Sequence, residues 1–103
     1  MGYYVLGEVT ERVRETKKDS PLQMVNEDYL RVFYFDRDAD WHVEDRDEFF
    51  VCLLGTVKFC VEDKDYNLKK GDLLVIEAGK SHRASSSGSV LLSLEPHEES
   101  AHF

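Results

Sequence analysis

The chain has 103 residues, which is the length of one small domain. Its formal net charge is −8, from 21 acidic and 13 basic residues, and a surface of this charge repels nucleic acids and anionic membranes. No apolar run reaches the roughly 20 residues of a membrane-spanning helix, and the N-terminus lacks the pattern of a signal peptide. We therefore expect a cytoplasmic protein that has neither nucleic acid nor a membrane as its partner.

The N-terminal arm, residues 1–28, has the least regular pattern. Within it, residues 8–18 contain several β-branched residues and no clean apolar stripe at helical spacing, so a short helix and an irregular strand are equally open. Residues 22–25 form the first candidate strand.

From residue 29 onward, short apolar segments alternate with turn residues. The expected strands cover residues 29–35, 48–53, 57–62, 73–76 and 90–94, of which 73–76 is a buried run. Polar turns are expected at residues 36–40, 63–65, 70–72 and 85–89. Many short strands separated by polar turns predict an all-β fold, either an antiparallel sandwich or a barrel.

The two strands around Gly55 are expected to form a hairpin whose loop is Leu54-Gly55. Side chains alternate along a strand, so one face of this hairpin is apolar except for Glu48, which needs a partner because an unpaired buried charge is costly. That face consists of Glu48, Phe50, Cys52, Val57, Phe59 and Val61. On the other face, another sheet or a second subunit is expected to cover Phe49, Val51 and Leu53, which lie beside Lys58, Cys60 and Glu62.

Two cysteines, Cys52 and Cys60, are too few for a disulfide framework, and the hairpin places them on opposite faces. Both are interpreted as packing residues.

Four residues could bind a divalent metal. His42 and Glu44 are two positions apart and point the same way on an extended strand. Glu48 follows after a short turn, and His82 lies much later in the chain. A barrel could bring all four side chains together on its inner face.

The spacing of these residues resembles the cupin family. The segment from His42 to Glu48, with Gly55 seven residues further on, is similar to the first cupin motif, in which His-x-His is followed by Glu and then Gly. The segment from Gly71 through Gly79 to His82 is similar to the second motif. Further resemblance over about residues 30–96 is to the small cupins of the mannose-6-phosphate isomerase-like kind.

The resemblance implies a single cupin domain, an antiparallel jelly-roll barrel whose core spans residues 30–96, with a short tail at residues 97–103. It also implies a homodimer, in which the N-terminal arm is a candidate for pairing with the second subunit, and a metal held by His42, Glu48 and His82. The chain departs from the family where Glu44 stands for the second histidine. Two smaller departures are Glu77 for the proline and Ser86 for the terminal asparagine of the second motif.

The Glu44 departure leaves three alternatives open. Glu44 is a fourth ligand, giving two imidazoles and two carboxylates that suit Fe(II), Mn(II) or Zn(II), or a general base beside the metal. Alternatively Glu44 turns outward and leaves three ligands, or metal binding has been lost. Phe50 and Phe59 are expected to line the cavity; Trp41 lines its mouth or belongs to the core. His97 and His102 are expected to be exposed.

Two hypotheses for the function follow. The first is a metal-dependent enzyme that acts on a small molecule, such as a dioxygenase or an isomerase. The second is a non-catalytic barrel that binds a sugar or another metabolite, with or without metal. The residues do not select one reaction, and fold similarity does not either.

Overall fold

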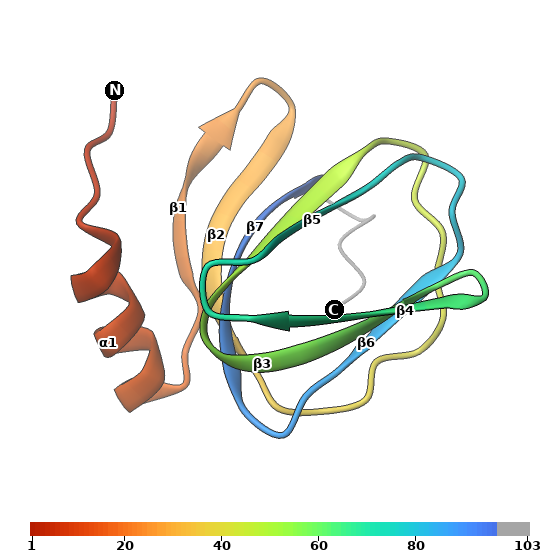
Figure 1. The fold of residues 1–103 in the computed structure, drawn as a ribbon. Helices are drawn as coiled ribbons and strands as arrows, with labels where there is room; N and C mark the ends of the chain where they lie inside the picture. Colours follow the sequence, from red (N-terminus) through yellow and green to blue (C-terminus); the bar gives the residue numbers. More distant parts are fainter. Residues whose placement is uncertain (97–103) are drawn as a thin grey trace.

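Extended backbone dominates residues 20–96, and one helix precedes it (Figure 1). The computed structural model describes residues 1–96. Within them, every pair of neighbouring strands is antiparallel, which confirms the predicted all-β fold. The elements are α1 Leu6–Thr16, β1 Ser20–Val25, β2 Asp28–Phe35, β3 Glu48–Val61, β4 Lys64–Lys69, β5 Leu73–Ile76, β6 His82–Ser85 and β7 Ser89–Pro96.

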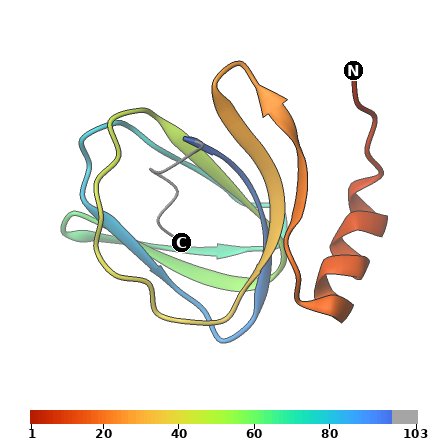
Figure 2. The same ribbon diagram turned by 180° about the vertical axis from the view of Figure 1, so that it is seen from behind.

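The strands form two sheets that share β3. In the first sheet the order is β1-β2-β7-β3-β5, and in the second sheet β3 lies between β4 and β6. The first half of β3 belongs to the first sheet and the second half to the second sheet, so the two sheets close around one interior (Figures 1 and 2). The main core, which includes Phe35, Phe50, Phe59, Ile76 and Leu91, fills this interior.

The predicted hairpin around Gly55 is wrong, because β3 runs through Gly55 without reversing. Gly55 has a φ of 77°, a conformation that favours glycine, and the pairing of β3 with β7 shifts register between Cys52 and Leu54. One extra residue at this bulge exchanges the inner and outer faces of the strand. The predicted apolar face is therefore confirmed, because Glu48, Phe50, Cys52, Val57 and Phe59 are all buried.

Residues 8–18, for which a helix and a strand were equally open, belong mostly to α1. The helix begins earlier, at Leu6, and buries Val9, Thr10 and Val13 against Val32 and Val90 on the outer face of the first sheet. Burial of this apolar face against the sheet stabilises the helix, since a helix of this length is marginal by itself. Figure 2 shows α1 on the side of the barrel opposite the second sheet.

Three further expectations need correction. The strand at 73–76 exists, but it is not a buried run, because Leu73 and Val75 are 57% and 52% exposed. Residues 64–65 were assigned to a turn and no strand was expected after them, yet β4 covers Lys64–Lys69. Strand β6 was not predicted at all, since its sequence, His-Arg-Ala-Ser, contains a single apolar residue.

Among residues 1–96, no helix is long and apolar enough to cross a membrane.

Candidate metal centre

The two motif segments lie side by side. His42 and His82 exchange two backbone hydrogen bonds of 3.0 Å, and the Gly79 amide donates to the Glu44 carbonyl at 2.9 Å. The Ala78 amide donates to Oδ1 of Asp47 at 2.8 Å. These contacts fix the segment before β3 against the segment before β6, so residues far apart in the chain meet at one end of the barrel.

His42, Glu48 and His82 come together as predicted. One potential ligand atom from each lies within 4.8 Å of the other two. Glu48 and His82 are almost completely buried, and His42 is partly buried. The two imidazole rings lie 4.2 Å apart between centroids. A nitrogen–nitrogen–oxygen set of this kind suits a first-row divalent metal.

Backbone carbonyls orient both rings. Nδ1 of His82 lies 2.9 Å from the Lys80 carbonyl oxygen, and Nδ1 of His42 lies 3.2 Å from the Asp40 carbonyl oxygen. A carbonyl can only accept, so each neutral ring carries its proton on Nδ1. Nε2 then keeps its lone pair for a metal, which is the usual arrangement of a histidine ligand.

Glu48 contributes the negative charge of the group. Its Oε1 lies 2.8 Å from Nε2 of His82. When the single proton of a neutral His82 ring is on Nδ1, neither of these two atoms can donate to the other, and they form an ion pair when the imidazole takes up a second proton. Burial lowers the pKa of His82, and the nearby Glu48 carboxylate, the Lys80 carbonyl and the Glu44 carboxylate together outweigh it. The pKa of His82 is therefore above its ordinary value.

The site passes a simple test of fit to a cation. Both carboxylate oxygens of Glu48 and Nε2 of His82 are buried and have no hydrogen-bond partner among the described residues. Buried polar atoms without such a partner are costly, and coordination to a metal would satisfy all three.

The other predicted site residues lie around this group. Glu44 is buried beside it, close enough to raise the pKa of His82, but it is not one of the three clustered ligands. Phe50 and Phe59 face the interior, where their ring centroids are 4.9 Å apart. Trp41 is 48% exposed, 5.7 Å from the Arg83 guanidinium, and so it does not belong to the buried core. His97 and His102 lie outside the described residues.

The interior contains a second polar group, which the sequence analysis missed. Glu95 on β7 is 1% exposed, contacts the Ser93 hydroxyl and lies 3.4 Å from the Arg31 guanidinium. Phe49, which follows Glu48, is paired with Leu94, which precedes Glu95, and these two side chains lie on the outer face of the first sheet. Because side chains alternate along a strand, Glu48 and Glu95 both lie on the interior face. A charged residue inside an apolar alternating strand is the only signal that could have found it.

The fold and the paired motif segments define the class of protein. The profile of the family described as "Cupin domain" matches residues 35–100, which is more than half of the chain. The chain belongs to the cupin family.

Individual relatives agree with this assignment. An uncharacterised protein of Bacillus subtilis (strain 168), YdbB, is 32% identical over 80 residues, which are 76% of this chain and 71% of that protein. Protein NMB1881 from Neisseria meningitidis has a similar fold, with a TM-score of 0.75 at 17% identity over 93% of this chain and all of that one. A cupin-2 domain containing protein from Shewanella frigidimarina NCIMB 400 has a TM-score of 0.71 at 22% identity, over 78% of this chain and 80% of its own. The two solved structures support the fold alone.

Proposed function

We propose that this cupin binds a divalent metal, Fe, Mn or Zn, through His42, Glu48 and His82, and that it is an enzyme acting on a small molecule. The observation that carries the proposal is the buried group of Glu48 and His82 atoms that have no hydrogen-bond partner among the described residues. Glu48 and His82 lie together with His42, with one potential ligand atom of each close to the other two. Backbone carbonyls next to the Nδ1 atoms orient both imidazole rings.

The charges of the interior support a cation. Three carboxylates, those of Glu44, Glu48 and Glu95, are at most 6% exposed, and among the buried residues described only Arg31 carries a permanent positive charge. An excess of buried negative charge is unfavourable unless something compensates it. A dication between Glu48 and the two histidines would supply that compensation.

Each residue has a distinct role in this proposal. A bound metal would supply Lewis acidity at a coordination position that protein ligands leave open. His42, Glu48 and His82 would hold it. The carbonyls of Asp40 and Lys80 orient the imidazole rings of His42 and His82, so that Nε2 of each ring would face the metal. Glu44, buried beside the group, serves as a fourth ligand or as the general base that takes a proton from the small molecule.

Elemental analysis tests the metal. Protein purified without added chelator should contain close to one equivalent of a single transition metal, and His82→Ala should contain only traces. Glu77→Gln provides a matched control for Glu48→Gln, because Glu77 is exposed and does not belong to the group of three ligands. Only the Glu48 variant should lose metal.

Two results would contradict the proposal. If the parent protein never holds more than trace metal after growth in metal-supplemented medium, metal binding is wrong. If metal is bound but no reaction is found with a panel of small metabolites, while one of them binds, the chain is a ligand-binding barrel instead of an enzyme.

We further propose that two copies of the chain form a homodimer through the part of the first sheet's outer face that α1 does not cover. Leu73 and Val75 are about half exposed there, and the neighbouring strands add partly buried apolar side chains. The face consists of Leu30, Phe49, Val51, Leu73, Val75 and Leu94. None of these six side chains carries a charge, so two chains of net charge −8 repel each other least at this face.

Light scattering after size-exclusion chromatography tests this interface. The parent should have the mass of a dimer, and Val75→Lys should have the mass of a monomer. Val43→Lys is the control, because Val43 is an equally exposed valine outside this face. A monomeric parent, or a Val75→Lys variant that is still dimeric, would exclude the interface.

A further inference from the structure

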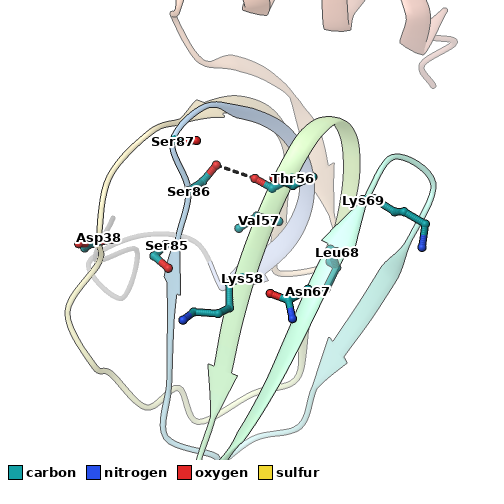
Figure 3. Close-up of a pocket in the computed structure, with 10 residues that line it drawn as sticks. All are labelled: Asp38, Thr56, Val57, Lys58, Asn67, Leu68, Lys69, Ser85, Ser86 and Ser87. Carbon is teal, nitrogen blue, oxygen red and sulfur yellow. Dashed lines mark hydrogen bonds between the residues drawn. The ribbon is translucent and has the colours of Figure 1, made fainter.

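A cavity of about 650 Å³ opens on the second sheet, away from the three candidate metal ligands. Its polar side chains come from β3, β4, β6 and the two loops beside β6 (Figure 3). We call this surface the polar trough, defined by Asp38, Thr56, Lys58, Asn67, Ser85 and Ser87. Its volume lies within the range of small-molecule sites.

Strand register places the trough residues in one row. Lys58 on β3 is directly opposite Asn67 on β4 and Ser85 on β6, and Ser85 is bridged in turn by Asp38. Directly opposed side chains on one face of a sheet are neighbours, about 5 Å apart at Cβ. The row therefore presents an amine, an amide, a hydroxyl and a carboxylate side by side.

Alternation shows that this row faces outward. Val57, Leu68 and Ala84, the sequence neighbours of the row, are buried in the interior core. Lys58 and Asn67 are exposed, and Ser85 is partly exposed. The trough thus lies on the opposite surface of the sheet from the side chains that fill the barrel.

The polar groups of the trough are not used within the described part of the chain. Lys58 makes no ion pair there, and the side chains of Asn67, Ser85 and Ser87 make no hydrogen bond with residues 1–96. One wall is nevertheless fixed, because the Ser86 hydroxyl donates to the Thr56 carbonyl at 2.7 Å and accepts from the Gly88 amide at 3.0 Å. The hydrogen bond between Ser86 and Thr56 is the dashed line in Figure 3.

We propose that the polar trough is a second, metal-independent binding site for a small anionic polyol, that is, a sugar carrying a phosphate or carboxylate group. The Lys58 amine would pair with the anionic group, and the serine hydroxyls, the Asn67 amide and the Asp38 carboxylate would bind hydroxyl groups. On a chain of net charge −8, an anion needs such a local cation. Among residues 1–96, no aromatic side chain lines the cavity, which disfavours a planar base as the ligand.

Nuclear magnetic resonance can test this site without knowledge of the natural ligand. The ¹⁵N-labelled parent chain is titrated with glucose 6-phosphate and with glucuronate, in the presence of a chelator. Amide shifts should map to residues 56–58, 67–69 and 85–87. Lys58→Gln should raise the Kd at least about tenfold, since loss of a charge-assisted contact costs on the order of 1.4 kcal/mol. Lys18→Gln, a surface lysine at the end of the helical arm, should bind as the parent does.

Several outcomes would overturn the proposal. These are the absence of shifts at millimolar ligand, equal binding by Lys58→Gln, and equal binding of uncharged glucose, which would exclude an anionic ligand class. Shifts that centre on Glu48 and His82 would place the ligand at the candidate metal centre instead. Binding by the His82→Asn variant should be unchanged, so failure of the metal proposal and failure of this one are distinguishable.

Discussion

Glu95 shows how one buried carboxyl group can be placed inside a barrel. It points into the interior from β7, next to Ser93 and Arg31, and Asp19 binds the other side of the Arg31 guanidinium at 2.6 Å. Burial raises the pKa of Glu95, and the Arg31 charge and the Ser93 hydroxyl offset that effect only in part. The folded protein therefore favours the protonated acid more than the unfolded chain does.

This difference predicts how Glu95→Gln changes stability with pH. Between the ordinary glutamate pKa of about 4.3 and the raised pKa of Glu95, the folded state binds the proton and the unfolded state has released it. Stability from this group is therefore lost as the pH rises through that window. Glutamine does not titrate, so the free energy of unfolding of Glu95→Gln relative to the parent should increase as the pH rises.

Urea unfolding of both proteins in chelator at a series of pH values measures this difference. Glu77→Gln is the control, because Glu77 is exposed. The difference in free energy of unfolding between this variant and the parent should be nearly constant with pH. If the free energy of unfolding of Glu95→Gln minus that of the parent is constant or falls as the pH rises, the raised pKa of Glu95 is contradicted.

Among the elements, β3 decides the architecture, and Gly55 allows β3 to cross between the sheets. Its φ of 77° lies in the left-handed region, and a Cβ at this position would overlap the carbonyl oxygen of Gly88. Gly55→Ala should therefore lower the free energy of unfolding by about 3 kcal/mol or more, because backbone strain and a steric clash combine.

Gly71 offers a matched control for this substitution. Its φ is 93°, yet no atom lies within 4 Å of an added Cβ. Gly71→Ala should cost only the strain of the backbone, about 1 kcal/mol. Equal losses for the two variants, measured by urea unfolding, would show that the contact with Gly88 does not matter.

The elements also show what local patterns can and cannot predict. Alternation correctly placed Glu48, Phe50 and Cys52 on one buried face, because alternation depends only on the backbone of the strand itself. It could not distinguish a hairpin from a bulge at Gly55, because both exchange the faces of the following strand. Pairing partners decide between them, and β7, β5, β4 and β6 are all later in the chain.

For the whole molecule, metal binding should be coupled to folding. The ligands come from the segment before β3, from β3 itself and from β6, so the complete set exists only in the folded barrel. Zn²⁺ at a free concentration 100 times its Kd should raise the free energy of unfolding by about 2.7 kcal/mol. Urea unfolding with and without Zn²⁺ measures the increase.

Two variants separate this coupling from general effects of the ion. Glu48→Gln should show almost none of the increase, whereas Glu77→Gln should keep all of it. If Zn²⁺ leaves the parent's stability unchanged, or stabilises Glu48→Gln equally, the three residues do not form a metal site in solution.

Local patterns in the sequence were enough to predict the fold class, the buried face at the start of β3, and His42, Glu48 and His82 as a candidate group, because alternation, turn residues and motif spacing are read along the chain. It did not determine which strand pairs with which, the exposure of Leu73 and Val75, or the burial of Glu95 beside Arg31. Those depend on where the sheets close, and closure depends on contacts between distant parts of the chain. The two motif segments lie side by side, with their ligand atoms close together, only because the folded barrel brings these distant parts of the chain into contact.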